Sequence, residues 1–142
     1  MKKLKNMLGK KVNAIVKEED LYPAIREYFS TNYKLYREVP FFNKRVDVVG
    51  IRDNEIIAIE MKLRDWKTAF RQAWVNQLFA NKSYVAMWHK YIGKLNYKYF
   101  VKYNVGIIEV KSNGTIKIIY EPQDNQPSKE MIRKLKIKII NA

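Results

Sequence analysis

Two β-like runs, residues 45–52 and 55–63, are separated only by Asp53 and Asn54, and this pairing constrains the fold more than any other feature. Both runs are rich in Val and Ile, which favour strands. Asp and Asn tolerate the positive φ that a two-residue hairpin turn requires. The sequence therefore predicts an antiparallel hairpin with a tight turn at these two residues.

The turn determines which residues of the hairpin face each other. If Arg52 faces Glu55, then Asp47 lies opposite Glu60. Facing side chains have Cβ atoms about 4.5–5.5 Å apart, and like charges so placed destabilise a sheet. Because side chains alternate along a strand, Lys62 shares the face of the two carboxylates. The other face of the hairpin is expected to hold apolar residues, namely Val46, Val48, Ile59 and Met61.

Two carboxylates held this close either share a proton or share a cation. Oxygen ligands suit Mg²⁺, which needs one or two protein carboxylates beside substrate phosphate oxygens, and Mn²⁺ is expected to substitute for it. Lys62 would then face the attacking water and the phosphate, as metal-assisted phosphodiester hydrolysis requires. The alternative is that Glu60 and Lys62 lie on a solvated strand face, with Asp47 paired to an arginine.

The remaining pattern predicts a mixed α/β (α+β) fold in a single domain over residues 1–142. Its parts are a basic N-terminal arm at 1–14, a core, and a polar gap with a basic C-terminal helix at 121–142, although the run LKIKII also alternates like a strand. Asp65 and Ser128 are placed to cap helices. Helices are expected near 18–30, 66–80 and 89–103, and further strands at 34–41, 83–87, 105–110 and 115–120.

The charge of the chain favours a polyanionic partner. Lys and Arg number 28 against 14 Asp and Glu, a formal net charge of +14, so nucleic acid is the first candidate, with a merely basic soluble protein as the alternative. The absence of Cys and a single His exclude disulfides and multi-histidine zinc sites. No apolar run has membrane-spanning length, no signal peptide precedes the core, and no glycine-rich phosphate loop is present. We expect a cytoplasmic protein that neither binds a membrane nor uses a nucleotide cofactor.

The stretch RVDVVGIRDNEIIAIEMKLRDW, residues 45–66, resembles the core hairpin of the PD-(D/E)xK nuclease superfamily. The resemblance covers about residues 15–110 and implies a restriction-endonuclease-like core of order αβββαβ. By position it implies that Asp47, Glu60 and the main-chain carbonyl of Met61 bind the metal, while Lys62 acts on the water or the phosphate. Val46 stands where the name-giving motif has Pro, which removes no ligand.

Members with a helix before the sheet often add a glutamate from that helix. Glu18 falls along the apolar stripe of the predicted first helix and Glu19 does not, so Glu18 is the expected further metal ligand and catalytic residue; the alternative is an acidic residue favoured by the helix dipole. Pro23 fits only the first turn of a helix. Gln72 resembles a family glutamine that approaches the site from the next helix, and Gln77 competes with it because it joins the inward stripe formed by Trp66, Phe70, Ala73 and Trp74.

Basic residues follow the hairpin directly. Arg64, Lys67 and Arg71 recur at spacings of three and four, so they share a helix side and are expected to contact DNA phosphates. In WHKYIGKLNYKYFVKY, residues 88–103, lysines alternate with aromatic residues, which suits backbone contact with base stacking. The simpler interpretation is an amphipathic helix with solvated lysines and core aromatics, in which His89 is a surface residue.

These features predict a Mg²⁺-dependent DNA nuclease. A structure-selective endonuclease of the Holliday-junction-resolvase kind, working as a homodimer on double-stranded or branched DNA, fits a small basic domain. One alternative keeps the fold without the chemistry, as a catalytically silent nucleic-acid-binding module. Another uses the two carboxylates as acid and base in an unrelated hydrolysis, which leaves the excess of Lys and Arg unexplained.

Overall fold

Six strands form one mixed sheet whose spatial order follows the sequence, in a computed structural model that describes residues 15 and 17–141. The first three strands are antiparallel neighbours, the third to fifth are parallel, and the sixth is antiparallel to the fifth. The strands are β1 (Lys34–Phe41), β2 (Lys44–Arg52), β3 (Glu55–Lys62), β4 (Lys82–Trp88), β5 (Gly106–Val110) and β6 (Ile116–Tyr120).

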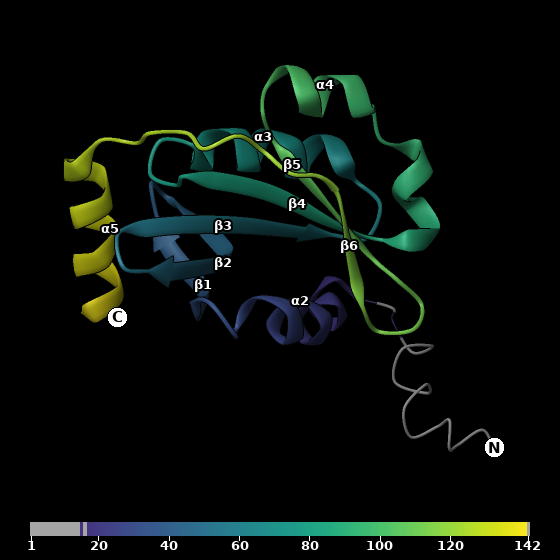
Figure 1. Ribbon diagram of the computed structural model, residues 1–142, viewed down its shortest axis with the longest axis horizontal. Helices are drawn as coiled ribbons and strands as arrows, with labels where there is room; N and C mark the ends of the chain where they lie inside the picture. Colours follow the sequence, from purple (N-terminus) through teal and green to yellow (C-terminus); the bar gives the residue numbers. More distant parts are fainter. Residues whose placement is uncertain (1–14, 16, 142) are drawn as a thin grey trace.

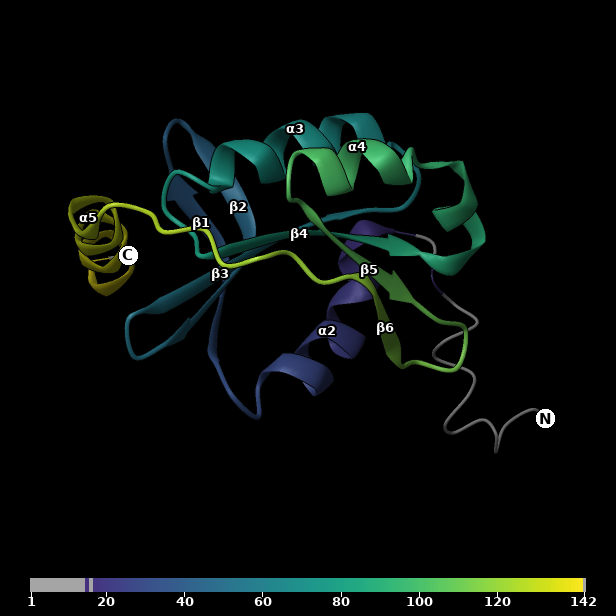
Figure 2. The same ribbon diagram turned by 45° about the horizontal axis from the view of Figure 1, so that its top comes forward.

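Helices cover both faces of this sheet (Figures 1 and 2). On one face lie α3 (Trp66–Asn76) and α4 (Tyr97–Lys102), which belong to the connections β3–β4 and β4–β5. Successive parallel crossovers of the same hand place their helices on the same face. The 3₁₀ turn η1 (Glu18–Leu21) and α2 (Tyr22–Phe29) cover the opposite face, and α5 (Lys129–Ile140) packs against β1. No helix in the described ranges is long and apolar enough to cross a membrane.

The core is divided by the sheet into two apolar layers. Between the sheet and the elements η1 and α2, residues such as Leu21, Ile25 and Ile59 are completely buried. On the other face, Phe100 packs with α3 in one cluster and Leu135 of α5 packs in another. This mixed α/β arrangement, with a six-stranded sheet between helices, is the fold class that the sequence predicts.

The predicted hairpin register is confirmed. The facing pairs run from Val48 with Ile59 to Arg52 with Glu55, and Asp53 has the positive φ of 55° that the turn requires. The predicted N-caps also form, because Asp65 accepts from the main-chain N–H of Thr68 and Ser128 from that of Met131. The alternating LKIKII run is helical, as part of α5.

The predicted alternation along β2 is wrong at one point. Val46 and Val49 lie in the same apolar cluster although they are three residues apart, while Val48 packs on the opposite face. The cause is an irregularity shared with β1, where Glu38 has φ 52° and the ladder skips Glu38 and Asp47. Asp47 is therefore released from the regular pleat, and Val46 does not share a face with Val48.

Two other helical predictions need correction. The helix expected at 89–103 is a 3₁₀ segment, η2 (His89–Lys94), followed by the short α4, which Asn96 caps through the N–H of Tyr99. Helix α3 ends at Asn76 instead of residue 80. The first helix begins as the 3₁₀ turn η1, and Pro23 lies in the first turn of α2, where it is tolerated. The N-terminal arm at 1–14 lies outside the described residues.

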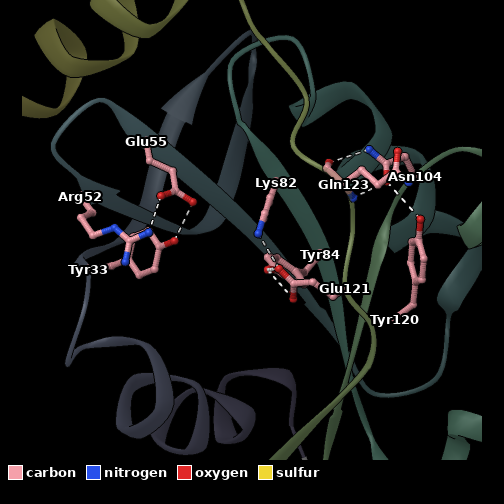
Figure 3. Close-up of polar contacts among 9 residues, drawn as sticks. All are labelled: Tyr33, Arg52, Glu55, Lys82, Tyr84, Asn104, Tyr120, Glu121 and Gln123. Carbon is pink, nitrogen blue, oxygen red and sulfur yellow. Dashed lines mark hydrogen bonds and ion pairs between the residues drawn. The ribbon is translucent and has the colours of Figure 1, made fainter.

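The segment 121–128 runs back across the sheet from β6 to α5 and is held by polar contacts (Figure 3). Glu121 accepts hydrogen bonds from Lys82 Nζ at 2.7 Å and from the hydroxyl of Tyr84 at 3.1 Å. Asn104 Oδ1 accepts from the hydroxyl of Tyr120 and from the N–H of Gln123. These contacts fix the path that brings α5 to β1.

Candidate active site

The candidate site lies at the carboxyl end of β3, at the opposite end of the strand from the Asp53–Asn54 turn (Figure 1). Here β2 and η1 approach the strand, and α3 covers it. Each predicted site residue near this end has a defined set of partners.

Glu60 points beneath α3 and is 1% exposed. Its Oε2 accepts hydrogen bonds from Asn76 Nδ2 at 2.8 Å and from Lys44 Nζ at 3.1 Å. Burial raises the pKa of Glu60 to about 6; the nearby charge of Asp47 adds to the rise, while Asn76 and Lys44 oppose it. Glu60 is thus a buried carboxyl group whose pKa is affected by the charge of Asp47.

Asp47 lies beside the backbone of β3. Its Oδ2 accepts from the main-chain N–H of Met61 at 2.7 Å. The β2–β3 ladder ends at the pair of Val48 and Ile59, so the carboxylate takes the place of a strand carbonyl for this N–H. Asp47 lies at the point where the β1–β2 ladder is irregular and skips both this residue and Glu38.

Lys62 forms an ion pair with Glu18, at 3.3 Å between Nζ and Oε2. Glu19, which follows Glu18 in η1, instead forms an ion pair with the exposed Lys17 at 3.1 Å. A cleft of about 470 Å³ opens beside Glu18, the partner of Lys62. Glu18, Asp47 and Met61 are among the residues that line this cleft. One carboxylate of the hairpin therefore borders open space, while Glu60 lies behind it under α3.

The structure does not gather the three expected carboxylates into one group. Within residues 15 and 17–141, no three Asp, Glu or His side chains are arranged to hold a metal ion. Glu18 forms an ion pair with Lys62, and Glu60 forms one with Lys44. The expectation that Glu18, Asp47 and Glu60 surround one metal ion is therefore not met in this arrangement.

The pair Asp47 and Glu60 nevertheless fits a hard cation by its chemistry. Both groups are carboxylates, their charges interact, and the hydrogen bonds that the described residues give to Glu60 all go to Oε2, leaving Oε1 for another partner. Carboxylate and main-chain carbonyl oxygens suit Mg²⁺ and Mn²⁺. Asp47, Glu60 and the carbonyl of Met61 are the groups that would hold such an ion.

Two residues of this site were missed by sequence reasoning, Lys44 and Asn76. Lys44 Nζ donates to Glu60, to Asn76 Oδ1 at 2.7 Å and to the carbonyl of Gln72 at 3.3 Å. Asn76 is completely buried on the inward side of α3. The available signal was the spacing of Asn76, four residues after Gln72, which places both on one helix side.

The two glutamine candidates lie in different places. Gln72 meets the site through its main-chain carbonyl, which accepts from Lys44. Gln77 donates to the carbonyls of Tyr103 and Asn104, so it joins α3 to α4 and lies away from Glu60. The predicted inward stripe is also wrong at Trp74, which is 51% exposed.

The basic residues expected to bind DNA are all exposed: Arg64 lies just before α3, and Lys67 and Arg71 lie in its first half. The guanidinium of Arg64 lies 5.3 Å from the ring centre of Tyr91. Hydrogen bonds from Thr68 hold the pKa of Asp65 below its usual range, and the charges of Lys62 and Arg71 act in the same direction. Lys67 lies between Lys62 and Arg71 in sequence, so the first half of α3, next to Lys62, is positively charged, whereas Glu60 contacts the other end of the helix at Asn76.

Comparison with known proteins supports the fold and leaves the chemistry open. No family model and no curated protein matches the sequence. Among solved structures, the SPO1766 protein of unknown function from Silicibacter pomeroyi matches with a TM-score of 0.70 and 16% identity, over 90% of this chain and 86% of that one. Similarity at this identity shows a shared fold, a six-stranded mixed sheet flanked by helices.

Proposed function

We propose that this protein is a metal-dependent nuclease that hydrolyses DNA phosphodiester bonds, and that its sheet is a restriction-endonuclease-like core. The observation that carries the proposal is the geometry at the carboxyl end of β3: Asp47 lines the cleft there, the buried Glu60 lies behind it under α3, and Lys62 follows two residues after Glu60. Two interacting carboxylates with an ammonium at the same strand end, next to a basic surface, are suited to phosphodiester hydrolysis.

In this proposal Asp47, Glu60 and the carbonyl of Met61 hold Mg²⁺ or Mn²⁺. The ion would supply a Lewis acid that lowers the pKa of a bound water. Lys62 offsets the negative charge that develops on the phosphate, and Glu18 orients Lys62 through their ion pair. Lys44 provides the positive charge that the buried Glu60 requires in the described structure, so cation binding and the Lys44 contact stabilise the same carboxylate.

The substrate follows from charge. Arg64, Lys67 and Arg71 extend along the exposed side of α3 from the site, and the chain carries a net charge of +14. Side chains of this kind contact backbone phosphates on either side of the cleaved bond. We propose double-stranded or branched DNA as the substrate, cut by a structure-selective endonuclease in which a homodimer presents two such sites.

One observation favours a second candidate, a DNA-binding module without catalysis. Glu60 is buried, its charge is compensated by Lys44 and it accepts a hydrogen bond from Asn76, as in a closed structural ion pair. A protein of this kind binds nucleic acid through the same basic surface and has no need of a metal.

Cleavage of a labelled panel of single-stranded, duplex, flapped and four-way-junction DNA distinguishes the two. We expect cutting with Mg²⁺ or Mn²⁺ and none with EDTA, and a loss of at least about 100-fold in Glu60→Gln and in Lys62→Ala. Glu55→Gln, at the other end of β3, is the matched control and should cut as the wild type does. Tight binding without cutting under either metal would replace the nuclease with the binding module.

A further inference from the structure

Four aromatic rings, from α3, from α4 and from Tyr103 directly after α4, form a connected cluster on the outer side of these helices. Phe70 contacts Tyr99 and Tyr103 at ring-centre distances of 6.1 and 5.8 Å. Trp74 contacts Tyr103 at 6.0 Å, and Tyr99 contacts Tyr103 at 6.1 Å. Figure 2 shows the two helices side by side on the face of the sheet opposite α2. We call these four rings the α3–α4 aromatic cluster.

Most of this cluster is not core. Trp74 is 51% exposed, Tyr99 49% and Tyr103 38%, whereas Phe100 on the other side of α4 is completely buried. The simpler interpretation of residues 88–103, with lysines in solvent and aromatics in the core, is therefore wrong for most of α4. Contiguous exposed aromatic surface of this kind marks an interaction site in soluble proteins.

The two helices that carry the cluster have charge of one sign. Residues 66–108 contain no Asp or Glu and seven Lys or Arg. Lys67 and Arg71 flank Phe70 and Trp74 on α3, while Lys98 and Lys102 flank Tyr99 on α4, and the Nζ of Lys102 lies 5.5 Å from the ring centre of Tyr103. The partner that covers this face must therefore be negatively charged and must present flat apolar surfaces.

A second copy of the chain does not satisfy that requirement. Two such faces in contact would bring their lysines and arginines together, and the segment offers no carboxylate to compensate them. A duplex presents phosphates but keeps its bases stacked inside, away from exposed rings. A single strand presents both phosphates and free base faces, which is the combination that aromatic platforms with flanking cations bind.

We propose that the α3–α4 aromatic cluster binds unpaired nucleotides of single-stranded nucleic acid, stacking bases on Trp74 and Tyr99. Arg64, Lys67, Arg71 and Trp74 recur at spacings of three and four, so an exposed basic path joins this cluster to the end of β3 that holds Lys62. The inference builds on the proposed function by specifying its substrate as DNA with an unpaired arm. The binding it describes needs neither metal nor cleavage.

The test is fluorescence anisotropy with a labelled single-stranded DNA, the corresponding duplex, and an RNA of the same sequence, all in EDTA. We expect Trp74→Ala and Tyr99→Ala to weaken single-strand binding by about 5- to 100-fold. Duplex binding should change by less than about twofold, because phosphate contacts remain. Trp74→Phe should restore most of the affinity for the single strand. Comparing the DNA and RNA probes shows which of the two nucleic acids the protein binds.

Tyr28→Ala is the matched control, since Tyr28 is 52% exposed on α2 beneath the opposite face of the sheet. It should bind all three probes as the wild type does. Equal weakening for single strand and duplex in the Trp74 variant, or no weakening, overturns the inference. So does a wild-type dimer, seen by sedimentation, that Trp74→Ala converts to a monomer, because the face is then an interface between copies.

The outcomes of the two proposals separate. If Trp74→Ala loses single-strand binding and the wild type cuts no DNA with any metal, the single-strand-binding proposal is supported and the nuclease proposal is contradicted. If the wild type cuts DNA, and Trp74→Ala keeps both its single-strand affinity and its cleavage, the nuclease proposal is supported and the single-strand-binding proposal is contradicted.

Discussion

The two glutamates of β3, Glu55 and Glu60, have similar partners and opposite behaviour. Glu55 accepts from Arg52 Nη2 at 2.6 Å and from the hydroxyl of Tyr33 at 2.8 Å (Figure 3). Glu60 likewise accepts from one cation, Lys44, and from one neutral group, the amide of Asn76. The side chain of Glu55 is 27% exposed and that of Glu60 only 1%.

Burial decides the difference between them. At Glu55 burial acts to raise the pKa, but hydrogen bonds from Arg52 and Tyr33 outweigh it, so the pKa lies below its ordinary value. At Glu60 burial outweighs Asn76 and Lys44, and the pKa rises to about 6. A buried carboxyl group whose pKa is raised toward neutral pH is typical of a functional site, whereas the contacts of Glu55 with Arg52 and Tyr33 hold the hairpin to the neighbouring structure.

The largest effect is expected from removing the cation at the buried end. Lys44→Met should lower the free energy of unfolding at neutral pH by about 3 kcal/mol, because it leaves a buried carboxylate without its counter-charge. Denaturant unfolding in EDTA measures this. If Asp47 and Glu60 hold a metal, Mg²⁺ or Mn²⁺ should stabilise Lys44→Met more than the wild type, since the ion replaces the missing charge.

Arg52→Met is the control for that measurement, as it removes the cation at the exposed end of the same strand. An equal loss of stability in the two variants would show that burial does not distinguish the pairs. Stabilisation by metal that persists in Asp47→Ala would place the ion elsewhere.

A medium effect is expected from pH. Because the pKa of Glu60 is higher in the folded state than the ordinary 4.5, its contribution to stability is fully present below pH 4.5 and is lost as the pH rises to about 6. A shift of this size corresponds to about 2 kcal/mol. Unfolding curves in EDTA should show that the wild type loses this much relative to Glu60→Gln between pH 4.5 and 7. Parallel pH profiles for the two proteins would contradict the assignment.

The end of β3 with the hairpin turn was largely predictable from sequence. Asp53 and Asn54 dictate the turn, and the turn dictates that Arg52 faces Glu55, because register in a two-residue hairpin follows from the turn geometry. The caps at Asp65 and Ser128 were equally accessible, since each depends on a contact only three residues away.

The buried end depends on contacts that local patterns do not encode. Lys44 contacts Glu60, which lies 16 residues later in the sequence, and Asn76, which lies 32 residues later. Neither contact follows from the periodicity of the sequence. The break in alternation at Asp47 arises from Glu38 on another strand. Trp74 is exposed because the buried residues Ala69, Ala73 and Asn76 set the inward side of α3, and in α4 Phe100 takes the buried position next to the exposed Tyr99.

The smallest effect is expected at Glu55. Arg52→Met should cost only a small fraction of the stability lost in Lys44→Met, because an ion pair with partners this exposed gains little over hydration and Tyr33 continues to hold the carboxylate. The loss should shrink further at high salt, since ions screen the exposed pair, whereas the loss in Lys44→Met should persist because Glu60 is shielded from solvent. Denaturant unfolding of both variants at low and high salt measures the contrast. A similar salt dependence in the two would mean that Glu60 is reached by solvent as readily as Glu55, and the raised pKa of Glu60 would then lose its physical basis.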